Sequence, residues 1–272
     1  MSTTIDQAFA KQFEREVHEA YQRQGSKLRN TVRVKNAVRG SSTVFQTVGK
    51  GSASTKSRHG MVPVMDAEFS AVEAQLEDFY AGDWVDQLDE LKTNLDERQI
   101  LANAGAFALG RKTDELIIAA MQGTTNLIEA NGTGLTKDKV LQAFEMLGSM
   151  DVPDDGQRYA VIGWRQWSDL LGLQEFASAD FVGDEQLPWR GTQAKTWLGT
   201  IWIPHSGLPS AQGERECFWY HKSAVGHAVG RDVHADITWH GDRASHFVAN
   251  SISQGAALID KKGVIKIFCQ ES

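Results

Sequence analysis

The spacing of apolar residues divides the first part of the chain into a helix and a strand-rich stretch. In residues 5–24, apolar side chains recur every three or four positions, which predicts an amphipathic helix that ends at Gly25. Between residues 31 and 64 the period changes to two, and Gly/Ser-rich segments interrupt it. This alternation predicts a long, exposed β-hairpin or paired ribbon, with residues 72–76 as a returning strand or a helix. Because a two-stranded ribbon is marginally stable alone in water, we expect it to lie on another surface.

The strongest helix prediction covers residues 95–122. No proline interrupts this segment, one of its sides is apolar, and Gly123 follows it. Thr93 and Asp96 have the spacing of a capping box at its start. At about 1.5 Å per residue, such a helix is roughly 40 Å long. Its middle, residues 102–110, is rich in Ala and Gly, so we expect other backbones to approach it closely.

Beyond residue 135, short helices and strands alternate. Thr136 is expected to cap a helix whose buried stripe consists of Val140, Leu141, Phe144 and Leu147. The elements predicted to follow are strand 158–163, helix 164–173, strand 199–204, strand 217–221, helix 222–229 and strands 235–240, 244–252, 255–260 and 264–269. The sequence therefore predicts a mixed α+β fold with no internal repeat.

The distribution of charge adds a feature that hydrophobicity does not show. The 272-residue chain has a formal net charge of -7, yet nine Lys or Arg and no carboxylate lie between Glu19 and Asp66. From Asp66 to Asp155, 19 acidic residues stand against 6 basic ones. Two such segments attract each other within a chain or between copies. Direct binding of nucleic acid and a simple solvated loop are the alternatives for the basic stretch.

Motifs for catalysis and metal binding are weak. Gly49-Lys50-Gly51 contains the Gly-Lys pair of a phosphate-binding loop but lacks its first Gly and its Ser/Thr. The histidines of the last third recur every six or seven residues, at His221, His227, His234, His240 and His246. Metal ligands are usually spaced by four residues on a helix or two on a strand, so a metal site rests only on His234 with Asp236 and His240 with Asp242. We expect no catalytic residue, no metal and no cofactor.

Two further observations concern the cellular setting. Cys217 and Cys269 lie far apart without CxxC spacing, which favours buried thiols over a disulfide. No stretch approaches the roughly 18 apolar residues of a membrane helix, and the first twenty residues do not resemble a signal peptide. We therefore expect a soluble protein that is made inside a cell and has no membrane partner.

Three segments carry a resemblance to a known family. DWVDQLDELKTNLDERQILANAGAFALGRKTDELIIAAM looks like the segment that leads into a long "spine" helix. RYAVIGWRQWSDLL and FWYHKSAVGHAVG resemble a strand–helix element and the return from it. With the order of the other elements, they resemble the major capsid proteins of tailed bacteriophages, which have the Hong Kong 97 (HK97) fold. The resemblance covers nearly the whole chain and implies pentamers and hexamers that form an icosahedral head shell around double-stranded DNA.

The resemblance also assigns domains and contact residues. It implies an HK97-like arrangement with an N-arm at 1–30, an E-loop hairpin at 31–75, a P-domain at 76–134 and 226–272 with its spine helix at about 94–122, and an axial A-domain at 135–225. The E-loop is expected to contact a neighbouring subunit through Arg33, Lys35, Arg39, Lys50, Lys56 and Arg58. The spine helix is expected to pack through Ala102, Ala106, Leu109, Leu116 and Ile117.

The implied partners are other copies of the chain, a scaffolding protein, a portal, an optional decoration protein and DNA held by mainly non-specific contacts. The implied location is the virion capsid, after synthesis in the host bacterial cytoplasm. Met1 favours a full-length chain with a separate scaffolding protein over a processed one. An encapsulin, the shell of a bacterial nanocompartment, is the first alternative. A nucleic-acid-binding protein is the second, although the ribbon has only one aromatic residue, Phe45, on which a base can stack.

Overall fold

The chain forms two compact units. A computed structural model describes residues 25–86, 97–177 and 195–271. The smaller unit comprises Met1–Gly25, Phe79–Arg111 and Val233–Ile252, and the larger one Ser26–Asp78, Lys112–Asp232 and Ser253–Ser272. The predicted helix at 5–24 and the predicted capping box at Thr93 and Asp96 lie outside the described residues.

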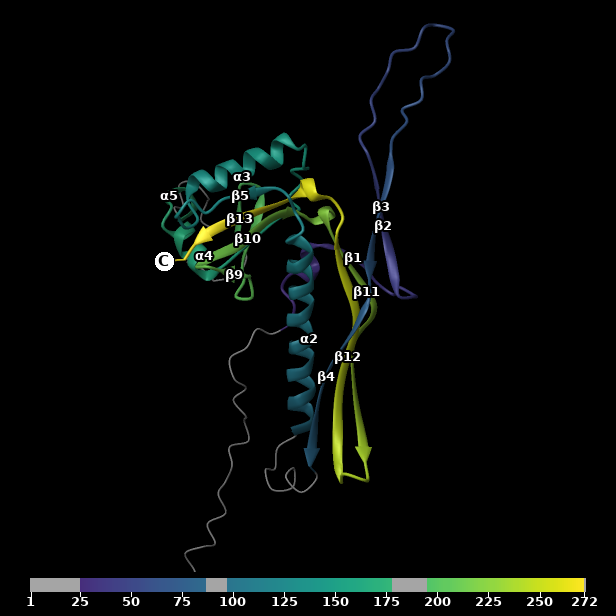
Figure 1. The fold of residues 1–272 in the computed structure, drawn as a ribbon, viewed down its shortest axis with the longest axis vertical. Helices are drawn as coiled ribbons and strands as arrows, with labels where there is room; N and C mark the ends of the chain where they lie inside the picture. The colour runs from purple at the N-terminus through teal and green to yellow at the C-terminus, as the bar shows by residue number, and fades with distance from the viewer. Residues whose placement is uncertain (1–24, 87–96, 178–194, 272) are drawn as a thin grey trace, which may run out of the picture. The chain divides into compact units, whose positions relative to one another are not determined.

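A seven-stranded sheet organises the larger unit (Figure 1). Its strands, in the order β5-β13-β10-β6-β8-β7, are β5 (Leu127–Ile128), β13 (Val264–Gln270), β10 (Glu214–His221), β6 (Arg158–Ile162), β8 (Thr200–Pro204) and β7 (Lys195–Trp197), and β9 (Ser210–Ala211) pairs with β10. β10 is antiparallel to both β13 and β6, whereas β6 and β8 are parallel. Helices α3 (Lys137–Ser149), α4 (Trp164–Leu171) and α5 (Gln174–Ala177) belong to this unit, as do residues 112–121 of helix α2 (Glu97–Met121). The predicted mixed fold is therefore confirmed in this unit.

Aromatic side chains fill the core of the larger unit. Phe218, Trp219 and Tyr220 on β10 are all fully buried, because this central strand is covered on both faces. A run of ring contacts crosses the core and joins Trp167, Phe176, Trp197, Trp202 and Trp219 in that order, with centroids 4.9–5.8 Å apart. Cys217 and Cys269 are free, buried thiols in this core, as the sequence predicts.

Helix α3 follows the predicted cap but not the whole predicted stripe. The Thr136 side chain accepts a hydrogen bond from the Lys139 backbone N–H, which fixes the start of the helix. Val140 and Leu147 are buried, but Leu141 is 45% exposed. Ala143 is fully buried on the same side as Val140, so the prediction for Leu141 is wrong.

A β-hairpin leaves the body of the larger unit. β2 (Ser42–Val48) and β3 (Phe69–Gln75) are antiparallel, and residues 49–68 connect them as a long loop, here called the hairpin tip (Figure 1). The predicted returning strand at 72–76 is thus confirmed as part of β3. The hairpin base is held by Phe45 and Ala74, which pack with Ala228, Ala257 and Ile259. Gly255 lies so close to the Gln75 carbonyl oxygen that a Cβ atom would overlap it.

Two parts of the predicted ribbon differ from this hairpin. β1 (Arg33–Lys35) pairs in parallel with Gly226–Ala228 of β11 (Val225–His240) and not with the hairpin. Val62 and Val64 lie in the exposed hairpin tip and not in a strand. The alternation around Pro63 is therefore not a strand signal, because a proline lacks the N–H that a ladder needs.

The smaller unit combines helix and sheet. It contains most of β4 (Glu77–Asp86), the first part of α2 (Glu97–Met121) and parts of β11 and β12 (Ser245–Leu258). The strands pair in the order β11-β12-β4, and the start of β11, which belongs to the larger unit, pairs with β1. Within this unit, a Cβ atom on Gly105 of α2 would overlap the side-chain amide of Asn250 on β12. The small residues of α2 thus permit the close approach that the sequence predicts.

The structure corrects three strand and helix predictions. The predicted helix 222–229 is a short 3-10 turn, Lys222–Ala224, followed by β11. Residues 225–229 are buried on both strand faces, so no period of two marks them as a strand. β12 is one continuous strand where two were predicted, and the acidic strand β4 was not predicted.

Candidate assembly surfaces

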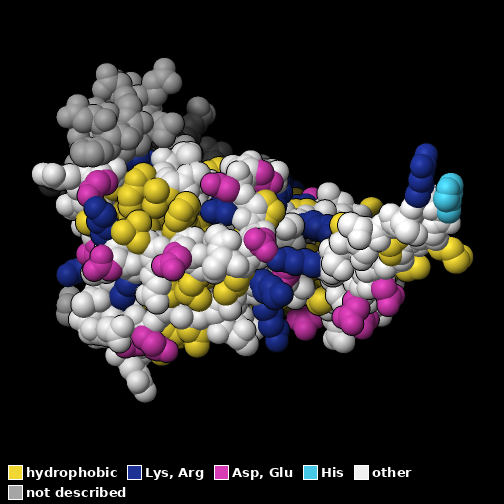
Figure 2. All heavy atoms as spheres, turned by 90° about the horizontal axis from the view of Figure 1, so that it is seen from above, with side chains coloured by type: hydrophobic (Ala, Val, Ile, Leu, Met, Phe, Trp, Pro, Cys, Tyr) yellow, Lys and Arg dark blue, Asp and Glu magenta, His cyan; other side chains and the backbone are white. Residues whose placement is uncertain are grey.

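The hairpin tip is the most exposed apolar segment that the structure describes. Met61 is 94% and Val64 86% exposed, with Val62 and Met65 also exposed. Hydrophobic side chains lie beside Lys or Arg and His at this end of the molecule (Figure 2). Long irregular loops are uncommon in compact domains unless they serve a function, and exposed apolar groups mark contact surfaces. The tip therefore has the properties of a segment that another surface covers.

The six predicted contact cations fall into two groups. Arg33 and Lys35 lie on β1 beside the hairpin base, where the Arg33 guanidinium is 5.7 Å from the Phe45 ring and Lys35 donates to the Val44 carbonyl at 3.5 Å. The other four are exposed and lie before β2 or in the hairpin tip: Arg39, Lys50, Lys56 and Arg58. Lys50 forms an ion pair with Asp151 of its own chain. Only Lys50, Lys56 and Arg58 therefore lie in the hairpin tip.

Charge also changes along the hairpin. Its first half carries cations without carboxylates, whereas its second half and the start of β4 carry exposed carboxylates at Asp66, Glu68, Glu73, Glu77 and Asp78. Helix α2, which was expected to contribute an acidic surface, has three carboxylates and three cations among its 25 residues. One of the three, Asp114, is fully buried. The exposed carboxylates therefore belong to the hairpin and β4 more than to α2.

A cleft separates the hairpin from the body of the larger unit. It has a volume of about 410 Å³ and is lined by residues of β2, β3, the α3–β6 loop and the β12–β13 turn. Its charged and titratable groups are those of Lys50, Glu68, Asp151, His221, Asp260 and Lys262. The Lys50–Asp151 ion pair lies at this cleft with both side chains exposed, so water and salt screen the attraction. The contact holds the hairpin only weakly to its own subunit.

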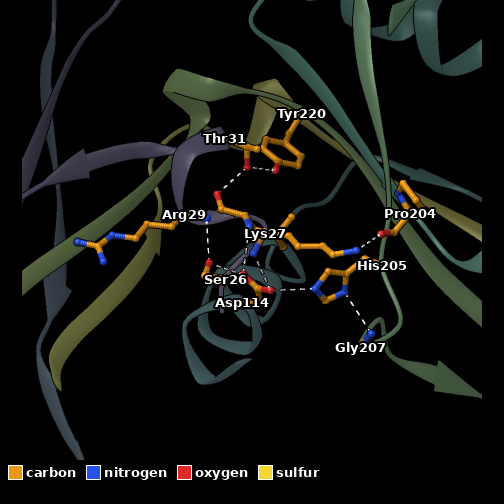
Figure 3. A network of polar contacts seen from close by, with 10 residues as sticks. Ser26, Lys27, Arg29, Thr31, Asp114, Pro204, His205, Gly207 and Tyr220 are labelled. Carbon is orange, nitrogen blue, oxygen red and sulfur yellow. Dashed lines mark hydrogen bonds and ion pairs between the residues drawn. The ribbon is translucent and has the colours of Figure 1, made fainter. Parts of the chain in front are cut away.

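A buried carboxylate anchors the chain where the larger unit begins (Figure 3). Asp114 of α2 accepts hydrogen bonds from Ser26 Oγ at 2.5 Å, from the Lys27 N–H at 3.2 Å and from the Leu28 N–H at 3.1 Å. His205, which follows β8, lies with Nε2 3.0 Å from the same carboxylate. Because the Gly207 N–H donates to His205 Nδ1, the Nε2 atom carries the proton and donates to Asp114.

The electrostatics of this anchor favour the charged carboxylate. Burial alone would raise the pKa of Asp114, but the hydrogen bonds from His205, Ser26 and the two backbone N–H groups outweigh it, and the pKa lies below its usual value of 3.8. The adjoining Thr31 hydroxyl contacts Tyr220 Oη at 2.5 Å, and burial raises the pKa of that phenol. The anchor fixes residues 26–31 against α2 and β10. The sequence offered no signal for it beyond an Asp inside a helix.

The five predicted packing residues of α2 differ in burial. Leu109 and Ile117 are buried, whereas Ala102, Ala106 and Leu116 are only partly covered. The closest approach involves Gly105 and Asn250, which the sequence analysis did not single out.

Substituting Gly105 tests this close approach. We expect Gly105→Ala to lower the free energy of unfolding by about 1–2 kcal/mol. The packing around the added methyl group must shift, and this usually costs more free energy than the helix gains when Ala replaces Gly. Urea denaturation measures the change. Asn250→Ala in the same chain removes the overlapping amide, so the double variant should recover most of the loss. An equal loss in the single and double variants would show that the contact is not the cause.

The histidines do not gather into one site. His227 is buried with Nε2 3.0 Å from Gln254 Oε1, and its burial lowers its pKa. His221 lies with Nδ1 2.8 Å from Ser223 Oγ and Nε2 3.1 Å from Asp155. The Ser223 N–H also donates to His221 Nδ1, so this side chain caps the 3-10 turn that follows β10. Across residues 25–86, 97–177 and 195–271, no three His, Cys, Asp or Glu side chains are grouped to hold a metal ion.

Solved structures with a similar fold come from phage capsids. The capsid of the cyanophage P-SCSP1u matches with a TM-score of 0.75 and 18% identity, over 100% of this chain and 96% of that chain. The capsid of Ralstonia phage GP4 matches with a TM-score of 0.74 and 13% identity, over 100% of this chain and 99% of that chain. A chain from Mycobacterium phage Che8 matches with a TM-score of 0.73 and 17% identity, over 94% and 95%. The fold is therefore the HK97-like capsid fold, as predicted.

The sequence itself supplies the family. A profile of the family described as "Phage capsid protein" matches residues 5–271, and the chain therefore belongs to the phage capsid protein family. It is a structural subunit of a phage head shell, in which copies of the chain assemble in the virion capsid. Among curated proteins, none matches the chain. No helix within the described ranges is long and apolar enough to span a membrane.

Proposed function

We propose that the chain assembles into pentamers and hexamers that close an icosahedral shell around double-stranded DNA. The observation that carries this proposal is the hairpin, which is anchored at its base and has an uncovered apolar tip. An exposed apolar surface of this kind marks an interaction site, and the phage capsid family supplies copies of the chain as neighbours. Electron microscopy and sedimentation of the purified protein test the proposal. Shells or capsomers of five or six copies support it, and a monomer at every concentration and salt contradicts it.

The proposed parts follow the predicted division into N-arm, E-loop, P-domain and A-domain. The hairpin corresponds to the E-loop, and α2 to the spine helix of the P-domain. We infer that the hairpin of one subunit lies across its neighbour and that its cations face carboxylates there. Scaffolding, portal and decoration proteins are further proposed partners, and the DNA contacts are proposed to be non-specific. The proposed role is structural and not enzymatic, and the family match supports a phage shell over an encapsulin.

Charge reversal at the hairpin tip tests the inferred contact. We expect the variant Lys56→Glu/Arg58→Glu to assemble several-fold less well at low salt, because like charges then face each other in every copy. Each exposed pair contributes only roughly 0–1 kcal/mol, but the contact recurs around each ring. Assembly should recover partly in 1 M salt, where the screening length falls to about 3 Å. Light scattering across a salt series measures this change.

The base cations provide the matched control. Arg33→Glu/Lys35→Glu makes the same change in charge on β1, and we expect a smaller effect on assembly because these residues lie beside the hairpin base of their own chain. If the tip variant assembles normally but its shells no longer retain DNA, the tip cations bind nucleic acid and the inferred contact between subunits is wrong.

A further inference from the structure

The loop between β5 and α3 contains the only Asn-Gly pair of the chain, Asn131-Gly132. The two residues form the centre of a β-turn in which the Thr133 N–H donates to the Ala130 carbonyl at 3.0 Å. Asn131 has a φ of 47° and Gly132 a φ of 68°, and a type I′ turn requires two positive φ values of this kind. Both residues are exposed, and a Cβ atom on Gly132 would meet no atom beyond its chain neighbours within 4 Å. The pair is therefore open to water.

A buried ammonium group holds both ends of this turn. The side chain of Lys139 on α3 is buried, and its Nζ atom donates to the Ala130 and Thr133 carbonyls at 2.8 Å each and to the Gly134 carbonyl at 3.0 Å. The same atom donates to the Phe268 carbonyl of β13 at 3.0 Å. An ammonium group has three protons, so these four carbonyls satisfy it fully. This arrangement, here called the Lys139 clamp, ties the turn to α3 and β13.

An asparagine that is followed by glycine can react without an enzyme. The backbone nitrogen of Gly132 attacks Cγ of Asn131, and the new C–N bond closes a succinimide ring. The bond from Cγ to the side-chain nitrogen breaks, and ammonia leaves with the proton that the Gly132 nitrogen gives up. Water then opens the ring at one of its two carbonyls, which yields aspartate or isoaspartate. Glycine favours the first step because it has no side chain to obstruct the close approach of its backbone.

We propose that Asn131 is a site of spontaneous deamidation and that the Lys139 clamp limits its rate. Ring closure requires the backbone between Asn131 and Gly132 to rotate, and the clamp holds the carbonyls on both sides of that pair in the turn. Each conversion replaces a neutral amide by a carboxylate, so the formal charge of the chain changes by one, from -7 to -8. The turn and the clamp lie within one subunit, so the inference does not depend on the proposed function.

The isoaspartate product has a structural consequence. Its backbone runs through the former side chain, which adds a methylene group between residues 131 and 132. The Ala130 and Thr133 carbonyls then cannot both keep their places around the Lys139 ammonium group. A buried charged donor that loses an acceptor destabilises the folded state. We therefore expect protein that contains isoaspartate at position 131 to unfold at a lower urea concentration than fresh protein.

Asp155-Gly156 offers an internal comparison, because glycine again follows a residue that can form the same ring. The Asp155 carboxylate accepts a hydrogen bond from the Gln157 N–H at 3.0 Å, and His221 Nε2 lies 3.1 Å from the same oxygen. These contacts lower the pKa of Asp155, so its carboxyl group is charged at neutral pH. A carboxylate anion resists attack by a backbone nitrogen. We therefore expect no isoaspartate at position 155.

Peptide mapping by mass spectrometry tests the site in purified protein that is held in a mildly alkaline buffer and sampled over weeks. We expect aspartate and isoaspartate to accumulate at Asn131, and to accumulate more slowly at lower pH, because the attacking nitrogen must lose its proton. Asn126 should stay unchanged, since its amide donates to the Lys261 carbonyl at 2.7 Å and a bulky leucine follows it. The control Asn131→Gln should keep its charge on ion exchange, because glutamine would have to close a larger ring.

The role of the clamp has its own test. The parent chain unfolded in guanidinium chloride lacks the clamp, and we expect Asn131 to react several-fold faster there than in the folded protein. Lys139→Met removes the ammonium group but keeps a long side chain, and a folded variant should show the same increase in native buffer. If this variant does not fold, the comparison of folded and unfolded parent decides the question alone. An Asn131 that stays intact in both states would overturn the site, and equal rates in both would overturn the role of the clamp.

Discussion

Replacing residues 50–67 by Asn-Gly is expected to give a folded, soluble subunit that no longer closes into shells. The replacement joins β2 to β3 through a short turn of a type that suits antiparallel strands, next to the existing Gly49 N–H to Glu68 carbonyl bond of 2.7 Å. The hairpin base keeps Phe45 and Ala74 in their packing cluster, and the core of the larger unit is unchanged. The variant loses only the hairpin tip, which is proposed to cover a neighbouring subunit. We expect particle yield to fall by at least a factor of one hundred.

Sedimentation and electron microscopy measure this loss, and far-ultraviolet circular dichroism checks the fold. Lys137→Ala is the control, because it breaks only the exposed ion pair with Glu175, away from the hairpin, and should assemble like the parent chain. A shortened chain that still forms normal shells would show that the hairpin tip has no role in closing them.

Substituting Asp114 by Asn is expected to destabilise the protein by about 3–5 kcal/mol, the loss found when one partner of a buried charged network is removed. The amide keeps the shape of the carboxylate but replaces one acceptor oxygen by a donor. It therefore cannot accept all the hydrogen bonds that Ser26, Leu28 and His205 make to Asp114. Urea denaturation measures the stability, and hydrogen exchange should show faster exchange in residues 26–31. Asp151→Asn, at an exposed carboxylate, is the control and should leave the urea unfolding transition almost unchanged.

The same carboxylate gives a pH dependence with a definite sign. Its pKa is lowered on folding, so the folded state binds fewer protons there than the unfolded state. The contribution of Asp114 is complete above the ordinary carboxyl pKa of 3.8 and is lost as the pH falls through the lower pKa of the folded state. Asp114→Asn should therefore remove part of the acid sensitivity below pH 4. An unchanged acid transition in the variant would contradict this role.

Local sequence patterns locate the helices and strands that have one buried face and one exposed face. Strand 158–163, the Thr136 cap and the long helix at 95–122 were predicted within two residues of β6, the start of α3 and α2. The start of β11 escaped detection because residues 225–229 are buried on both faces, which leaves a continuous apolar run that also fits a helix. The spacing of apolar residues thus depends on how many faces of a helix or strand are buried.

The candidate surfaces were predictable in a similar, partial way. The charge pattern together with the family resemblance pointed to Lys56 and Arg58, and the structure shows that both are exposed. Met61 and Val64 were not singled out in the sequence, because only the structure shows that nothing in the described chain covers them. Asp114 was missed because its partners come from three distant segments.

The close approach of Gly255 to the Gln75 carbonyl has a geometric consequence for a closed shell. In the proposed icosahedral shell, subunits of pentamers and hexamers meet their neighbours at different angles. The hairpin base cannot bend to follow these different angles, because there is no room for a side chain between it and Gly255 of β12. The tip has neither regular strands nor a tight connection to the body, so it is the part that can bend to follow each angle. We therefore expect position 255 to tolerate almost no substitution, while the angle between base and tip differs among copies of one chemical sequence in the same particle.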